Sequence, residues 1–137
     1  MPRADFFTFL VRSLRLIASE QPQAHDALAA TIGGMQACLH TDGVARWIRF
    51  DGFGWTLHSC SQYTDLDVGF DMKVILDLVD GHITLEQAIA QERLRIRGSS
   101  DAIERFYHAL LIYLEALIRS SGAIDLLNEL RMGMPFA

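Results

Sequence analysis

Residues 35–58 decide the fold class, and they read MQACLH-TDG-VARWIRF-DG-FGWTLH. Apolar and polar side chains alternate within the three longer pieces, which is the period of two expected of half-buried β-strands. The breaks between these pieces contain Asp42-Gly43 and Asp51-Gly52. Asp-Gly pairs favour hairpin turns because glycine accepts a positive φ. The stretch therefore predicts three strands joined by tight turns.

The same alternation returns twice further along the chain. Residues 65–70 carry an apolar side chain at every second position, and so do residues 93–97, which Gly98 ends. We expect the first segment to add a fourth strand to an antiparallel meander, and the second to form a short fifth strand.

The remaining segments have helical periodicity. Apolar residues recur at three- and four-residue spacing, Asp71 is a good N-cap, and Thr84 with Gln87 reads as a capping box. The expected helices cover residues 3–20, 23–32, 71–81, 84–91, 100–120 and 123–131.

These elements predict a single domain, 1–137, of the α+β class. Two N-terminal helices occupy residues 1–32, and a helical tail occupies residues 121–137. Between them, residues 33–120 form a mostly antiparallel five-stranded sheet covered on one face by helices.

Composition narrows the class of function. The chain of 137 residues is 50% hydrophobic and 21% charged, which excludes an intrinsically disordered protein. Its net charge of −5 is opposite in sign to that of proteins that hold nucleic acid by its phosphates, so no nucleic-acid partner is expected. No secretory signal is found, and the two cysteines fit reduced cytosolic thiols, so we expect a cytoplasmic location.

Cys38-Leu39-His40 and His58-Ser59-Cys60 form a mirror-image pair of motifs with four zinc-ligand side chains. In a meander the strand from Val44 to Phe50 lies between the two motifs. Because neighbouring strands are about 4.8 Å apart, the two pairs would be about 10 Å apart, too far for one tetrahedral metal. We expect outer-face residues here, with no metal and no cofactor.

Nothing in the sequence nominates a catalytic group. Asp65 and Asp67 share a strand face, as paired catalytic carboxylates can, but that face is the polar one where solvated acids are expected. His25, His82 and His108 have no serine, cysteine or carboxylate at motif spacing. We therefore expect a protein without enzymatic activity.

The predicted sheet and helices carry many apolar side chains for a fold of this kind. The sheet offers one apolar face, and at least three helices offer apolar stripes to cover it. A surplus of apolar surface leaves a cavity, or meets a partner or a lipid, whereas complete core packing is the alternative. The first helix, Phe-rich on one side and Arg-bearing on the other, is also a candidate for transient contact with a membrane surface.

From Thr64 to Gly98 the chain resembles the sterol carrier protein type 2 family of lipid-binding domains. The strand Asp65-Leu66-Asp67-Val68, the helices at 71–81 and 84–89, and the strand Arg93-Leu94-Arg95-Ile96-Arg97-Gly98 follow the family's order. Residues 47–52 and the long helix downstream are also similar, so the resemblance covers about residues 33–120. The chain departs from the family pattern at three turn or capping positions, where Leu85, Glu92 and Ser99 replace the usual Pro, Gly and Asp.

The resemblance implies a hydrophobic tunnel or cavity between sheet and helices that holds a fatty acyl, sterol-like or isoprenoid lipid. Such a chain can be held by shielding alone, since each buried CH₂ is worth roughly 0.8 kcal/mol. The candidate lipid-binding residues are the inward strand positions and the helix positions that face them: Ile48, Phe50, Trp55, Leu57, Leu66, Val68, Phe70, Ile75, Leu78, Phe106 and Leu110.

Three functions stay open at this point. The first is a lipid carrier without catalysis. The second is an interaction module in which the first helix and the tail residues Ile124, Leu127 and Leu130 bind a partner or a second copy, as in a homodimer. The third is an accessory subunit that presents a lipid substrate to an enzyme, for instance in isoprenoid-quinone synthesis.

Overall fold

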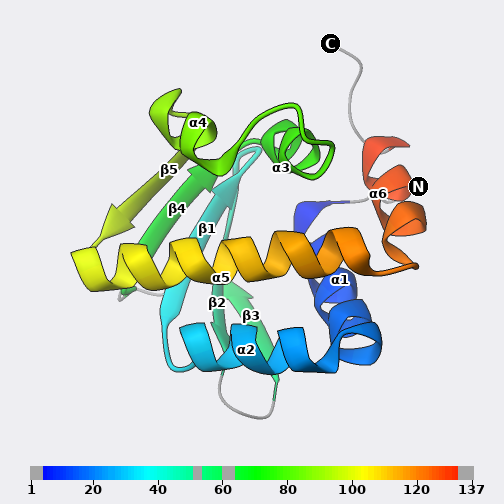
Figure 1. The fold of residues 1–137 in the computed structure, drawn as a ribbon. Coiled ribbons are helices and arrows are strands. Elements are labelled where there is room, and N and C mark those ends of the chain that lie inside the picture. The colour runs from blue at the N-terminus through cyan, green and yellow to red at the C-terminus, as the bar shows by residue number, and fades with distance from the viewer. Residues whose placement is uncertain (1–4, 51–53, 60–63, 133–137) are drawn as a thin grey trace.

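The sheet has five strands in the order β3-β2-β1-β4-β5 (Figure 1). The computed structural model describes residues 5–50, 54–59 and 64–132. The strands are β1 (Gln36–Thr41), β2 (Val44–Phe50), β3 (Trp55–Ser59), β4 (Leu66–Phe70) and β5 (Leu94–Gly98). The pairings β1–β2, β2–β3 and β4–β5 are antiparallel. The expected α+β class and mostly antiparallel sheet are therefore confirmed.

The fourth strand corrects the expected meander. Strand β4 pairs with β1, not with β3, and the two strands run parallel. Asp65 secures the start of this pairing: its carboxylate accepts a hydrogen bond from the Gln36 N–H at 2.9 Å, and its own N–H donates to the Gln36 carbonyl at 2.8 Å. Ala37 then lies opposite Leu66, and Leu39 opposite Val68. The pairing makes β1 the central strand and joins the apolar faces of β1 and β4.

The β1–β2 hairpin has the predicted turn. Asp42 and Gly43 both adopt positive φ, 52° and 78°, as a two-residue type I′ turn requires. The second predicted turn, Asp51-Gly52, lies outside the described residues.

The described residues form six helices, in the expected order. They are α1 (Phe6–Glu20), α2 (Pro22–Ile32), α3 (Met72–Val79), α4 (Leu85–Ala90), α5 (Ser100–Arg119) and α6 (Ala123–Met132). Asp71 caps α3 through the Val74 N–H, and Thr84 and Gln87 form the predicted capping box of α4.

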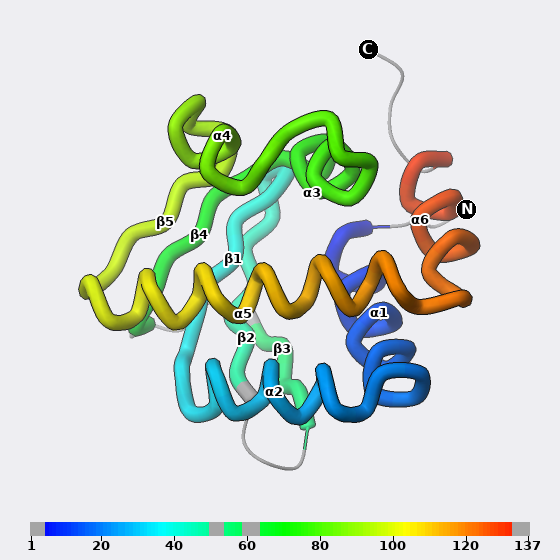
Figure 2. Tube along the Cα trace, viewed as in Figure 1, coloured from blue at the N-terminus to red at the C-terminus, as the bar shows by residue number. Residues whose placement is uncertain are grey.

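Helices α1, α2 and α5 cover one face of the sheet (Figures 1 and 2). Helix α5 runs across the strands with α2 beside it, and α1 packs against both α2 and α6. Helices α3 and α4 lie at the end of the sheet where β4 ends and β5 begins. The inward residues of the strands and the buried residues of these helices form one hydrophobic core.

Two helix C-termini use the same motif with different residues. After α3, the His82 N–H donates to the Asp77 carbonyl and Gly81 has a φ of 77°. After α4, the Arg93 N–H donates to the Ala88 carbonyl and Glu92 has a φ of 60°. Both are Schellman motifs, which place one residue in the left-handed conformation that glycine adopts at no steric cost. Glu92 occupies that position with a Cβ, so the second motif is strained.

We predict opposite effects for exchanges at these two positions. Glu92→Gly should raise the free energy of unfolding by up to about 1 kcal/mol because it removes the left-handed strain, while Gly81→Glu should lower it by about 1–2 kcal/mol. Urea unfolding followed by circular dichroism measures both variants. A Glu92→Gly variant less stable than the parent chain contradicts this account of the α4 terminus.

Glu20, the last residue of α1, joins the end of this helix to the turn between α5 and α6. Its Oε1 accepts hydrogen bonds from the Ser121 N–H at 2.8 Å and the Ser121 hydroxyl at 2.6 Å, and its Oε2 accepts one from the Gly122 N–H at 3.1 Å. These donors favour the carboxylate, so the pKa of Glu20 lies below its ordinary value, with the Ser121 hydroxyl as the largest cause. Gly122 leaves room for this contact, because a Cβ there would lie 2.8 Å from Leu16 Cδ1 and 3.2 Å from Glu20 Oε2.

The lowered pKa predicts a pH-dependent contribution to stability. The unfolded chain binds the Glu20 proton more tightly than the folded chain, so the contribution is present above the ordinary pKa of 4.5 and is lost as pH falls through the folded pKa. Glu20→Gln should lower the melting temperature at pH 7, and the difference from the parent should shrink in acid. Glu115→Gln, which alters an exposed ion pair within α5, is the control. An unchanged difference between pH 7 and pH 3 would count against a role for the Glu20 charge.

Candidate functional site: an apolar cavity

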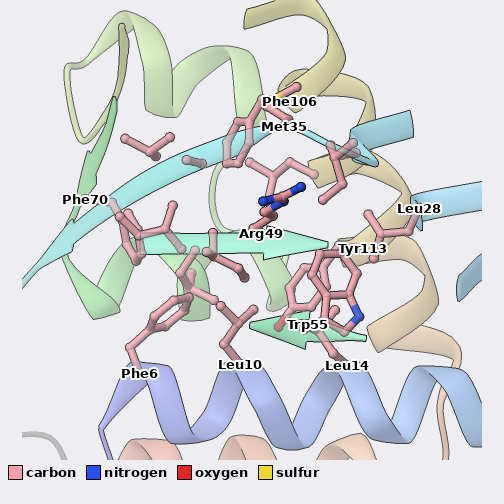
Figure 3. A pocket seen from close by; sticks show the side chains of 18 of the residues that line it. Phe6, Leu10, Leu14, Leu28, Met35, Arg49, Trp55, Phe70, Phe106 and Tyr113 are labelled. Carbon is pink, nitrogen blue, oxygen red and sulfur yellow. The ribbon is translucent and has the colours of Figure 1, made fainter. Parts of the chain in front are cut away.

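A cavity of about 100 Å³ lies between the sheet and helices α1, α2 and α5 (Figure 3). It is partly open to solvent, and its walls are almost entirely apolar. Every strand and the helices α1, α2, α3 and α5 contribute to it. The lining residues are Phe6, Leu10, Leu14, Leu28, Ile32, Met35, Ala37, Leu39, Ile48, Arg49, Trp55, Val68, Phe70, Ile75, Leu94, Phe106, Ala109, Leu110 and Tyr113.

The periodicity of each element places these side chains on the cavity wall. Helix α5 contributes Phe106, Ala109, Leu110 and Tyr113, at the three- and four-residue spacing of one helix face. Ala109 carries only a methyl group, so this part of the α5 wall is set back from the sheet. A hollow thus remains where larger side chains would have filled the layer.

The cavity volume sets a limit on what fits without movement. About 100 Å³ is far above the roughly 10–15 Å³ that a water molecule occupies, and below the roughly 150 Å³ of an apolar cavity known to take up benzene. A short apolar group therefore fits as the walls stand. A long hydrocarbon chain must extend through the open side or move wall side chains apart.

Tyr113 presents a hydroxyl at the edge of this apolar surface. Its oxygen lies 2.7 Å from the Ser13 Oγ, and the Ser13 hydroxyl in turn donates to the Leu10 carbonyl at 2.8 Å. The Tyr113 O–H therefore donates to Ser13. Burial raises the pKa of Tyr113 well above its ordinary value, so the phenol stays neutral.

The indole of Trp55 is also tied to the protein. Its Nε1–H donates to the Nε2 of His25 on α2 at 3.1 Å, and the two rings meet edge to face. This contact joins α2 to the strand β3, whose Trp55 lines the cavity (Figure 3). Both side chains thus direct a polar group to a protein partner, and the cavity offers mainly hydrocarbon surface to a ligand.

Many of the candidate lipid-binding residues named from the sequence lie in the cavity wall. Ile48, Trp55, Val68, Phe70, Ile75, Phe106 and Leu110 line it. Leu57, Leu66 and Leu78 pack in or against the core without lining the cavity. The side chain of Phe50 lies outside the described part of the structure. Lipid binding by these residues stays a prediction.

The candidate residues named from the sequence include none from the first two helices, although both helices line the cavity. Phe6, Leu10 and Leu14 of α1, and Leu28 and Ile32 of α2, line the cavity. The apolar period of α1 is visible in the sequence, but it does not tell which strand or helix the stripe faces. That information comes only from the docking of α1 beside α2 and α5.

The expectation of two reduced thiols is wrong for Cys38, which is disulfide-bonded. The chain's only other cysteine, Cys60, lies outside the described residues. A chain with two cysteines cannot form a framework of several disulfides, but the count does not exclude a single disulfide bond. Because disulfides persist mainly in oxidising compartments, the cytoplasmic location loses the support that reduced thiols gave it and stays a prediction.

The two acidic residues of β4 and its approach have separate surroundings. Asp65 holds the Gln36 N–H, whereas Asp67 is exposed with its Oδ1 3.5 Å from the His40 Nε2. They do not form a carboxylate pair at the cavity.

The terminal helices bury most of the surface assigned to partners. Leu127 and Leu130 of α6 are buried within the domain and Ile124 is exposed. The apolar stripe of α1, including Phe6, Phe9 and Leu10, is also buried. In the described residues, no helix is both long and apolar enough to cross a membrane. Membrane contact and dimerisation stay predictions.

Comparison with known proteins places this geometry in a known fold. No protein-family model matches the sequence, and no curated protein matches it. Among solved structures, "UbiJ-SCP2 Ubiquinone synthesis protein" is similar with a TM-score of 0.58 and 16% identity, over 85% of this chain and 95% of that one.

Two sterol carrier structures are similar to the same degree. The sterol carrier protein domain 2 of Helicoverpa armigera gives a TM-score of 0.57 at 10% identity, over 78% of this chain and 89% of that one. A crystal structure of sterol carrier protein 2 gives 0.55 at 11% identity, over 82% and 98%. At such identities the likeness concerns the fold, and it bears out the resemblance seen in the sequence: the chain has the fold of sterol carrier protein 2 domains.

Proposed function

We propose that this protein binds the hydrocarbon chain of a lipid in the cavity between the sheet and helices α1, α2 and α5, and carries it without catalysis. The observation that supports the proposal best is the cavity itself, a hollow with apolar walls where complete packing was the alternative. Transfer of hydrocarbon from water to such a site is favourable in proportion to the apolar area removed from water.

The polar atoms near the cavity are consistent with a hydrocarbon ligand. The Tyr113 hydroxyl and the Trp55 indole N–H both have protein partners, Ser13 and His25. Arg49 is the one charged residue among the described lining residues, and it is exposed. A ligand therefore gains affinity mainly from its apolar length, with its polar end left toward solvent.

An accessory role in isoprenoid-quinone synthesis is a second candidate. A similar structure carries the description "Ubiquinone synthesis protein", and an isoprenoid tail is a hydrocarbon of the kind the cavity suits. This role adds an enzyme partner to the same binding activity, and co-purification with an enzyme complex would distinguish it.

A matched pair of variants on α5 tests whether the cavity is hollow. Ala109 and Ala116 lie two turns apart on α5 and are each 3% exposed, but only Ala109 lines the cavity. Ala109→Leu should change the free energy of unfolding by less than about 1 kcal/mol because its added carbons enter empty space. Ala116→Leu should cost about 1–3 kcal/mol because it overpacks a filled core. Equal losses in urea unfolding contradict the hollow.

A series of saturated fatty acids tests what the cavity binds. Displacement of a fluorescent fatty acid should improve by about fourfold for each added CH₂, which corresponds to roughly 0.8 kcal/mol, until the chain exceeds the site. Ala109→Leu should weaken binding across the series, whereas Ala116→Leu should leave it unchanged at temperatures where it is folded.

Native mass spectrometry of the purified protein gives an independent check, with co-purified lipid as the expected result. Absence of displacement for every chain length, together with no co-purified lipid, would overturn the proposal and leave only the fold.

A further inference from the structure

The outer face of the sheet, opposite the cavity, brings together three metal-ligating side chains. They are Cys38 and His40 of β1 and Asp67 of β4, and one sulfur, nitrogen or oxygen atom from each lies within 4.8 Å of the others. The His40 Nε2 and Asp67 Oδ1 atoms are 3.5 Å apart. The side chains of His40 and Asp67 are 53% and 55% exposed, so solvent reaches the site, while Cys38 forms its buried floor.

The parallel pairing of β1 and β4 produces this arrangement. Cys38 is the register partner of Asp67, and His40 lies two residues further along the same face of β1. Tetrahedral zinc with bonds of about 2.0–2.3 Å separates its ligand atoms by about 3.3–3.7 Å. The His40–Asp67 distance already falls in that range, and small side-chain rotations bring the sulfur to it.

The disulfide of Cys38 decides whether this set can bind a metal. The metal ligand is the thiolate, and a sulfur held in a disulfide does not supply one. We propose that Cys38, His40 and Asp67 form a zinc site that is closed while the disulfide is intact and opens when it is reduced. This proposal is independent of lipid binding in the cavity.

Reduction of the disulfide frees the Cys38 sulfur to act as the third ligand. A phosphine or dithiol reductant gives two electrons, the S–S bond breaks, and each sulfur takes a proton. Zn²⁺ then binds the Cys38 sulfur and releases its proton, and His40 Nε2 and an Asp67 oxygen complete three ligands, with water in the fourth position.

Trp47 offers a hydrogen-bond donor to a thiolate at Cys38. It lies directly opposite Cys38 in the β1–β2 register. Its indole N–H is buried and has no hydrogen-bond partner among the described residues. A metal-bound Cys38 thiolate on the same sheet face is an acceptor for this N–H. Hydrogen bonds to metal ligands commonly fix the orientation of those ligands.

Cobalt titration of the full chain tests the proposal. Co²⁺ alone is added to oxidised protein and to protein reduced with tris(2-carboxyethyl)phosphine, and the sulfur-to-cobalt charge-transfer band is recorded. Reduced protein should bind one Co²⁺, displaceable by Zn²⁺, and oxidised protein should bind at least about 10- to 100-fold more weakly, the range that loss of even a supporting group costs.

Single variants separate the proposed ligands from other groups. Cys60→Ser, which removes the chain's only other cysteine, should bind Co²⁺ without any reductant. In the reduced protein, His40→Ala and Asp67→Asn should each weaken binding by at least about tenfold. His108→Ala is the matched control, because His108 forms an exposed 3.8 Å pair with Glu104 that includes no cysteine; it should bind as the parent does.

Three results would overturn the proposal. They are absence of the charge-transfer band in both the reduced chain and Cys60→Ser, equal binding by oxidised and reduced protein, and full binding by both His40→Ala and Asp67→Asn. Far-UV circular dichroism of every variant establishes that it is folded, and chemical reduction of the unaltered chain keeps the test valid if a variant is not.

Discussion

The parallel pairing of β1 with β4 determines how the sheet is ordered and which of its faces the helices cover. It places β1 between β2 and β4, so Ala37 and Leu39 continue the apolar surface of Leu66 and Val68. Helices α1, α2 and α5 then cover one broad apolar face instead of two narrow ones. The same pairing sets Cys38 and His40 beside Asp67 on the opposite face.

The cavity follows from how that broad face is covered. Rigid side chains from five strands and several helices must meet in one layer, and a small residue such as Ala109 leaves space that its neighbours do not fill. An empty apolar volume forfeits contacts that a packed core would have. A hydrocarbon ligand restores those contacts, which gives a physical reason for binding that requires no specific polar recognition.

The sequence predicts local structure well and the pairing of distant segments poorly. Strand periodicity, the Asp42-Gly43 turn, the Asp71 cap and the Thr84–Gln87 capping box depend on residues a few positions apart, and all are present in the structure. The choice of β1 as the partner of β4 depends on Asp65 and Gln36, 29 residues apart, and no local pattern encodes it. The disulfide of Cys38 is hidden from composition for the same reason.

The candidate site shows the same division. Alternation along the strands identifies inward residues such as Ile48 and Val68, because a strand's two faces are determined by its own sequence. It does not separate cavity walls from filled core, so Leu66 and Val68 read alike although only Val68 lines the hollow. The contribution of Phe6 and Leu28 depends on how α1 and α2 dock, which the helical period leaves undetermined.

A crystal of this protein exposed to pressurised xenon shows whether the interior is hollow, since xenon enters apolar cavities that exclude water. We expect an anomalous xenon peak between the sheet and α5, bounded by Phe106, Tyr113 and Val68. Continuous protein density across that space, with no xenon in it, would mean that the interior is filled and holds no cavity for a hydrocarbon ligand.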